Sequence, residues 1–229
     1  MKILHSNLIG DSKRDLFIIH GFLGMGDNWK THAKKIAEND FRVHLIDLRN
    51  HGKSFWSNDF SFEIMVDDLY KYAEYYNIKK FSFLGHSMGG NIGMLFAQKF
   101  PELLEKIIIV DIIPKEYKPL HETILTGLKS IDFNKIKSRK HVDVHLSKYI
   151  SDERVRQFLL KNLYWVDKES LGLKFNIDVL FDFKERLSIK LKKGITFNKP
   201  SLFLYGDSST YVEESDFPIL YSNFPNIKI

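Results

Sequence analysis

The sequence predicts an α/β fold, a doubly wound and mostly parallel sheet with helices on both faces. Five short runs rich in β-branched and aromatic residues each end in Gly, Pro, Asp or His, which is typical of buried parallel strands. They read DLFIIHGF, FRVHLIDLRNHG, KFSFLGHS, LEKIIIVDIIP and PSLFLYGD. Helix-like segments separate most of these runs, and such alternation implies right-handed crossovers within one sheet.

Three segments between the runs have helical character: residues 28–39, 61–77 and 91–100. In the second segment apolar residues recur at the helix period from Phe62 to Tyr76, which predicts one buried face. Ser61 precedes that pattern and is a residue type that caps helix starts.

The alternation stops at residues 115–195, which are amphipathic, charged and helical in pattern. We predict that residues 1–114 form the core, that residues 115–195 form an inserted helical lid, and that the core continues in residues 196–229. A lid over the strand ends would shape a substrate pocket and exclude water from it.

Charge and composition limit the classes of partner. The net charge is +5, and residues 115–195 carry 18 Lys and Arg against 11 Asp and Glu, so the basic excess lies in the predicted lid. Solvated lysine-rich helix faces explain this excess about as well as a site for anionic substrates. No nucleic-acid-binding motif accompanies it, and we expect no nucleic-acid partner.

The chain of 229 residues contains no cysteine, which excludes disulfides, thiolate metal sites and a cysteine nucleophile. Absence of cysteine fits a reducing compartment, so we predict a cytoplasmic protein. The first residues lack the apolar stretch of a signal peptide, and the longest apolar run, IIIVDII, is interrupted by Asp111. No membrane span is expected.

A serine flanked by glycines follows the third predicted strand, where residues 85–89 read G-H-S-M-G. A sharp strand-to-helix turn strains its central residue and needs small neighbours, which Gly85 and Gly89 supply. The Ser87 hydroxyl would stand clear of the sheet at a helix N-terminus, where the dipole favours negative charge. A phosphate loop would need G-x-G-x-x-G, which GHSMGGNIG lacks. The motif predicts that Ser87 is a nucleophile.

An oxyanion formed by attack of Ser87 needs two hydrogen-bond donors. The backbone N–H of Met88, directly after the serine, is one. The loop HGFLGMGDNW supplies the other, because the Phe22 N–H follows an early strand and is expected to point inward. We interpret His20 as a structural residue of this loop.

The segments HGFLGMGDNW, DLRNHGKS, GHSMGG, VDIIP and LFLYGDSSTYV together resemble the α/β-hydrolase superfamily, and specifically its YbfF-like serine esterases. The resemblance runs over nearly the whole chain. It implies a serine esterase or thioesterase acting on acyl esters through an acyl-enzyme, without a metal or cofactor. By position, Ser87 resembles the nucleophile, and Phe22 and Met88 resemble the oxyanion donors.

The triad acid has two candidates. Asp111 follows IIIV at a strand end, a position that some members of the superfamily use. Asp207 lies in the loop after the next strand, two residues before the usual acid position, which is Ser209 here. We favour Asp111, whose task would be to fix the tautomer of a histidine.

The base is not evident, because the fold's chain order is serine, acid, histidine and no histidine follows His145. FPNIKI resembles the opening of the last strand, so we expect that strand and its following helix to be incomplete and activity to be impaired. A separate C-terminal fragment is one expected partner.

We expect His121, His141 and His145 to be solvated lid residues and His86 to point away from Ser87. The alternative function is a degenerate, non-catalytic module that binds a small molecule or a protein.

Overall fold

The computed structural model describes residues 2–117 and 121–229. Its central sheet has seven strands in the order β1-β3-β2-β4-β5-β8-β9. β1 pairs with β3 in antiparallel fashion and the other neighbours pair in parallel. The strands are β1 (Ser6–Ile9), β2 (Asp15–Ile19), β3 (Arg42–Ile46), β4 (Phe81–His86), β5 (Leu104–Val110), β8 (Ser201–Leu204) and β9 (Ile227–Lys228). The predicted α/β class is confirmed, and all five predicted strands form in parallel.

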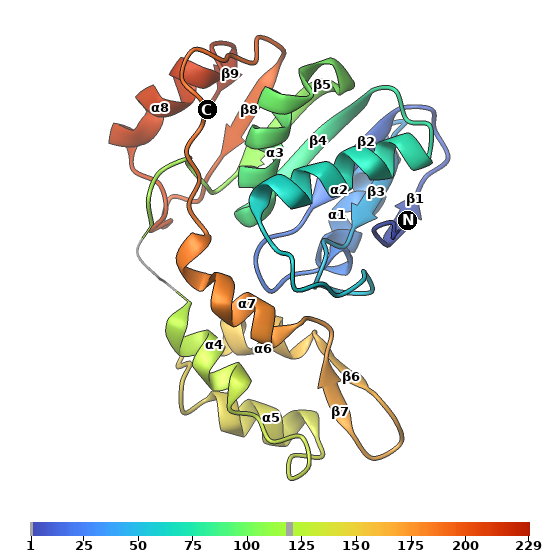
Figure 1. Cartoon of the computed structure of the whole chain (residues 1–229), viewed down its shortest axis with the longest axis vertical. Helices are drawn as coiled ribbons and strands as arrows, with labels where there is room; N and C mark the ends of the chain where they lie inside the picture. Colours follow the sequence, from blue (N-terminus) through green and yellow to red (C-terminus); the bar gives the residue numbers. More distant parts are fainter. Residues whose placement is uncertain (1, 118–120) are drawn as a thin grey trace.

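Side chains along β2 alternate between two apolar layers. Phe17 and Ile19 belong to the larger layer, which contains the buried faces of α2 (Phe62–Tyr75), α3 (Met88–Lys99) and α8 (Phe217–Asn223). Leu16 and Ile18 point to the opposite face, where they pack with α1 (Lys30–Ala37). Figure 1 shows α1 behind the sheet and α2 and α3 in front of it. Helices therefore cover both faces, as in a doubly wound fold.

The three predicted helices form with shifted starts. A 3₁₀ turn, η1 (Gly26–Trp29), precedes α1, whereas α3 already begins at Met88. The Ser61 hydroxyl accepts a hydrogen bond from the Ile64 N–H, 3.3 Å away, and so caps α2 as predicted. Shorter 3₁₀ turns follow at η2 (Pro101–Leu103), η3 (Lys184–Arg186) and η4 (Glu214–Asp216).

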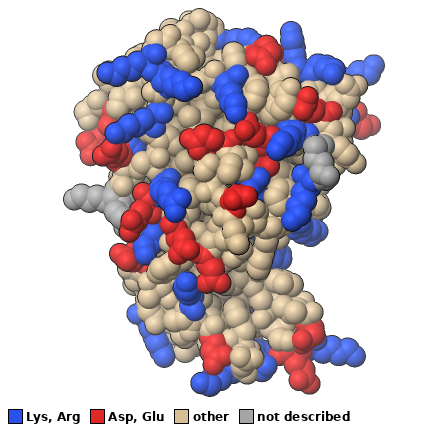
Figure 2. All heavy atoms as spheres, viewed as in Figure 1, with Lys and Arg blue, Asp and Glu red and all other residues tan. Residues whose placement is uncertain are grey.

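Between β5 and β8 the chain forms a second group of elements beyond one end of the sheet (Figure 1). These are α4 (Glu122–Lys129), α5 (Arg139–Leu146), α6 (Glu153–Leu160), β6 (Leu163–Trp165), β7 (Leu171–Leu173) and α7 (Ile177–Phe183). The antiparallel hairpin of β6 and β7 departs from the all-helical expectation. Figure 2 shows basic and acidic side chains interspersed over this part of the visible face, without a continuous basic patch.

Several hydrogen bonds between described residues tie this second group to the core. The Asn162 side-chain amide donates to the Leu23 carbonyl at 3.0 Å, and the Asn176 N–H donates to the Asn50 carbonyl at 3.0 Å. The Asn91 side-chain amide donates to the Leu187 carbonyl at 3.1 Å. Leu23 and Asn50 lie in the loops after β2 and β3, so the group sits at the carboxyl ends of the parallel strands.

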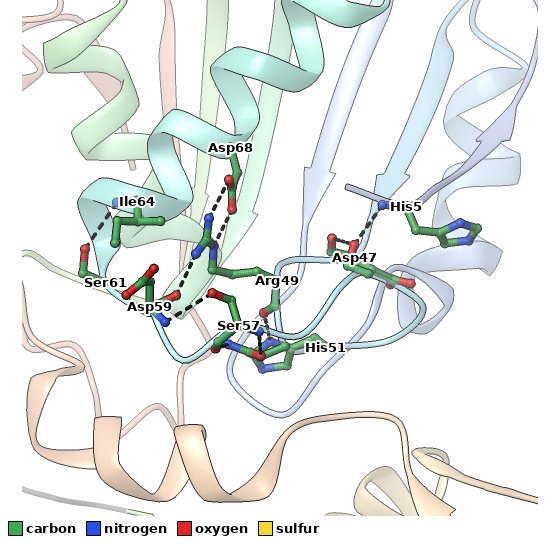
Figure 3. A network of polar contacts seen from close by, with 11 residues as sticks. His5, Asp47, Arg49, His51, Ser57, Asp59, Ser61, Ile64 and Asp68 are labelled. Carbon is green, nitrogen blue, oxygen red and sulfur yellow. Dashed lines mark hydrogen bonds and ion pairs between the residues drawn. The ribbon is translucent and has the colours of Figure 1, made fainter. Parts of the chain in front are cut away.

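The loop between β3 and α2 is held by buried polar contacts (Figure 3). Arg49 forms a two-pronged ion pair with Asp68 of α2, at 2.5 and 2.7 Å, and donates to the Asp59 carbonyl at 2.7 Å. The Asp47 carboxylate accepts from the amides of Gly26 and Lys53 at 2.7 and 2.9 Å. The loop is thereby fixed against α2 and against the loop after β2.

None of the helices formed by residues 2–117 and 121–229 is long and apolar enough to cross a bilayer. The cytoplasmic location stays a prediction.

Candidate active site

Ser87 is the single residue between β4 and α3. Its backbone has φ 51° and ψ −118°, a strained conformation for a residue with a side chain. A Cβ on Gly85 would lie 2.2 Å from the Gly89 carbonyl oxygen, and one on Gly89 would lie 2.4 Å from the Ile19 carbonyl oxygen. The bend therefore requires glycine at both positions. Its geometry is that of a nucleophile elbow.

The Ser87 side chain is half-buried and borders two adjoining cavities. The larger, with a volume of about 360 Å³, lies beside Ser87, Asp111 and Phe22. The smaller reaches from Ser87 and Met88 toward Leu187 of the second group of elements. Ser87 is thus accessible from these two cavities. The core forms one side of them, and residues of the 115–195 segment form the other.

The residues that carry the predicted oxyanion donors, Phe22 and Met88, line the smaller cavity together with Ser87. Met88 is the first residue of α3, and the first amides of a helix have no intrahelical acceptor. Phe22 follows β2 in a turn closed by the Gly24 N–H, which donates to the Gly21 carbonyl at 3.0 Å. Among the described residues, the Phe22 amide donates no backbone hydrogen bond. Phe22 borders both cavities together with Ser87, so the structure brings the two predicted donors and the serine to one place.

The two candidate acids differ in their surroundings. Asp111 follows β5 with φ 56°, and its N–H donates to the Leu204 carbonyl at 2.7 Å. It borders the larger cavity with Ser87, and its Oδ1 is buried without a hydrogen-bond partner in the part of the chain that the structure describes. Asp207 is exposed and borders neither cavity. The geometry favours Asp111.

Four histidines line the larger cavity near Ser87, namely His20, His32, His86 and His121. His20 has both ring nitrogens engaged, one with the Gly21 carbonyl at 2.8 Å and the other with the Leu48 N–H at 3.0 Å, as expected of a structural residue. His86 borders the same cavity as Ser87, and its ring lies 6.1 Å from the Trp29 ring between centroids. Its direction away from Ser87 stays a prediction. A Cβ on Gly21 would lie 2.9 Å from His86 Nδ1 and 3.2 Å from Ser87 Cβ, so these two side chains are close.

The expectation of a solvated His121 is wrong. Its ring is half-buried, borders both cavities and packs against Phe22 with 5.4 Å between ring centroids. His141 is exposed as expected, while His145 accepts or donates a 2.9 Å hydrogen bond with Ser130. Across the described residues, no three His, Asp or Glu side chains gather in a metal-binding group.

Burial alters the protonation of the rings and phenols at this site. It lowers the pKa of His86, against the opposing attraction of Asp111, and it lowers the pKa of His121. It raises the pKa of Tyr117 to about 12, and it raises the pKa of Tyr211. At neutral pH the imidazoles are therefore uncharged and the phenols keep their protons.

The family model described as "alpha/beta hydrolase fold" matches residues 16–226. The chain belongs to the α/β-hydrolase fold family. It is 29% identical to "Esterase YbfF" of Escherichia coli over 93% of this chain and 82% of that protein. It is 32% identical to "sn-1-specific diacylglycerol lipase ABHD11" of Danio rerio over 94% of this chain and 70% of that protein.

A solved structure of another member, "Marine microorganism esterase", superposes with a TM-score of 0.95 at 35% identity, covering 100% of this chain and 90% of that one. This α/β-hydrolase therefore shares its fold with an esterase along its entire length.

The structure adds residues that sequence patterns did not select. Tyr117 and Tyr211 border the smaller cavity with His121, and the Tyr117 hydroxyl binds the backbone of Ile113 at 2.9 Å. Tyr117 lies in none of the quoted motifs, and Tyr211 lies within LFLYGDSSTYV but was assigned no role there. Both reach the α/β-hydrolase site through tertiary packing of the 115–195 segment and the loop after β8.

Proposed function

We propose that this chain is a serine hydrolase of carboxylic esters or thioesters and that Ser87 is its nucleophile. The observation that carries the proposal is the bend at residue 87, where a strained serine at a helix N-terminus opens onto a cavity. The relatives named esterase and lipase support the reaction class.

In this mechanism the Ser87 hydroxyl attacks the ester carbonyl and the negative charge develops on the carbonyl oxygen. The amides of Phe22 and Met88 stabilise that charge in a site partly shielded from water. Fixed donors of this kind are worth about 3 kcal/mol each in other hydrolases. The collapse of the tetrahedral intermediate releases the alcohol or thiol and leaves an acyl-enzyme, which water then hydrolyses.

Asp111 is the proposed triad acid. Its buried, unpartnered Oδ1 beside Ser87 is the acceptor that an imidazolium would need. No hydrogen bond joins the Ser87 hydroxyl to a base within the described residues, and the sequence has no histidine after His145. We therefore propose that the intrinsic rate of this chain is impaired.

We propose that residues 115–195 act as the lid of the acyl site. His121 and Leu187 border the cavities at Ser87, and apolar side chains such as Ile112 and Phe158 complete the walls. An apolar enclosure of this kind suits the acyl chain of a small ester or thioester.

The proposal is tested with a p-nitrophenyl ester and with a fluorophosphonate that labels activated serines. Wild type should hydrolyse the ester above the buffer rate and be labelled, and Ser87→Ala should lose both. Asn223→Ala, remote from the cavities, is a matched control that should retain them. Equal rates for wild type and Ser87→Ala would exclude a serine mechanism.

Among the described residues, no base forms a hydrogen bond with Ser87. This observation favours a second candidate function, in which the chain is a degenerate α/β-hydrolase that binds an acyl compound without hydrolysing it. Saturable binding of the ester to both wild type and Ser87→Ala, with no hydrolysis by either, would identify this function.

A further inference from the structure

Asn91 of α3 carries a buried hydrogen-bond acceptor beside the candidate active site. Its side chain is 1% exposed and borders the smaller cavity together with Ser87. Its Nδ2 donates to the Leu187 carbonyl at 3.1 Å, which fixes the orientation of the amide. Its Oδ1 is buried without a hydrogen-bond partner among the described residues. A buried acceptor without a donor is unfavourable, so a ligand that brings a donor to this oxygen gains affinity.

The polar side chains of the cavity wall are engaged elsewhere. The Tyr117 hydroxyl donates to the Ile113 carbonyl at 2.9 Å, and the Lys184 ammonium lies 3.5 Å from the Glu122 carboxylate. The wall also includes Glu185, whose charge is opposite to that of Lys184, so the cavity has no net charge that would attract an ion. A carboxylate would be repelled by the amide oxygen, because both groups only accept hydrogen bonds. The matching group is therefore a neutral donor, and a hydroxyl is the smallest one.

The position of Asn91 sets how far this donor lies from the reacting carbonyl. Its backbone N–H donates to the Ser87 carbonyl at 3.1 Å, so Asn91 lies one helical turn after the serine. Residues four apart in a helix share a face and are separated by about 6 Å along the axis. A hydroxyl on the second carbon of an acyl group would remain beside Ser87, whereas one on the third carbon extends toward the next turn.

The volume of the smaller cavity limits the length of the acyl group. This volume is about 30 Å³, which has room for about two water-sized groups such as a hydroxyl and a methyl. Ile112 and Leu187 provide apolar wall surface for the methyl. A long acyl chain does not fit into this space.

We propose that the smaller cavity is a subsite for short acyl groups with a hydroxyl on the third carbon, and that Asn91 Oδ1 accepts a hydrogen bond from that hydroxyl. The inference deepens the proposed function and rests on it. The ester bond breaks, water adds its OH to the acyl carbon and its remaining proton to the leaving oxygen, and the products are a 3-hydroxy acid and an alcohol. Ser87, the oxyanion donors and Asn91 are fixed points around the acyl group, so one enantiomer is preferred.

The subsite is tested by comparing kcat/KM for p-nitrophenyl butyrate and for the two enantiomers of p-nitrophenyl 3-hydroxybutyrate. In wild type the better enantiomer should exceed butyrate by about tenfold, the effect of one good hydrogen bond. Asn91→Leu has a similar volume but no acceptor, and it should lower this ratio about tenfold. Intrinsic differences in ester reactivity cancel, because each variant is assayed with the same esters. Equal ratios in wild type and Asn91→Leu would overturn the proposal.

Gln98 offers a matched control on the same helix. Its side-chain amide donates to the carbonyls of Lys192 and Ile195 at 3.0 and 3.1 Å, so it also joins α3 to the chain before β8. Gln98 does not border the smaller cavity. Gln98→Leu should therefore leave the ratio of the esters unchanged. An equal fall of the ratio in Gln98→Leu and Asn91→Leu would assign the effect to packing between these segments and would contradict the role of the Asn91 oxygen.

A binding measurement separates the subsite from the proposed reaction. Ethyl butyrate and ethyl 3-hydroxybutyrate are titrated into Ser87→Ala, with and without Asn91→Leu, and the amide NMR signals are followed. The hydroxy ester should bind about tenfold more tightly than ethyl butyrate only where Asn91 is present. If this preference occurs but wild type hydrolyses neither ester, the proposed function fails and the subsite stands. If hydrolysis depends on Ser87 but neither measurement shows the preference, the subsite fails and the proposed function stands.

Discussion

His51 shows how a single buried residue couples the stability of the fold to pH. Burial and the neighbouring His20 ring, 5.0 Å away between centroids, lower the pKa of His51 from 6.5 to about 3. Its Nε2 is buried without a partner among the described groups. The folded state therefore holds His51 neutral, whereas the unfolded chain protonates it below pH 6.5.

We predict that the free energy of unfolding falls as the pH is lowered from about 6.5 toward 3, because the unfolded state binds the extra proton. His51 contributes about 1.4 kcal/mol per pH unit within this window. Urea unfolding at pH 7, 6 and 5 measures the slope. His51→Gln should reduce it by that amount, while His141→Gln, an exposed control, should leave it unchanged. Equal slopes for all three proteins would contradict this account.

Residue roles differ in how far sequence predicts them. The positions of Ser87, Phe22 and Met88 are set by local chain geometry, so the G-x-S-x-G pattern and the loop after β2 are enough to select them as candidates, and their catalytic roles stay predictions. His121 was misjudged, because the burial of a ring at a helix start depends on what packs against it. Phe22 determines the surroundings of His121, and it lies about a hundred residues away in sequence.

At the scale of elements, the ion pair of Arg49 with Asp68 joins the loop after β3 to α2. Both side chains are less than a tenth exposed. We predict that Asp68→Ala lowers the free energy of unfolding by about 3–5 kcal/mol, because it leaves a buried guanidinium unpaired. Asp67→Ala removes only the half-exposed pair with Lys99 and should cost about 1 kcal/mol or less. Urea unfolding measures the free energy of unfolding of both variants. Equal losses would contradict the larger contribution of the buried ion pair between Arg49 and Asp68.

The elements that sequence predicted best are those with a strong period or a buried run, namely the five parallel strands and α2. β1 and the β6–β7 hairpin escaped prediction for a physical reason. Leu8 of β1 and Trp165 of β6 are more than half exposed, so these strands lack the continuous apolar run that marks a buried strand. Their pairing partners, and not their own composition, place them in sheets.

At the scale of the whole molecule, the two faces of the sheet are covered unequally. One face packs against α2, α3 and α8, whereas α1 covers only part of the other. Beside α1, a groove of about 320 Å³ runs across β2, β4, β5 and β8. Its walls are mainly apolar and include Leu16, Ile36, Leu84, Ile108 and Leu202. Water in such a groove is unfavourable, so a covering segment would stabilise the fold.

We expect this groove to bind an apolar polypeptide segment. Adding the C-terminal peptide of a related esterase should raise the midpoint of thermal unfolding, by roughly 2–4 °C for each kcal/mol of stabilisation. Ile108→Glu places a charge in the groove wall and should abolish the gain, while Val144→Glu, on the exposed side of α5, should not. A midpoint that stays constant with the peptide, or rises equally in Ile108→Glu, would show that this face is not where the segment binds.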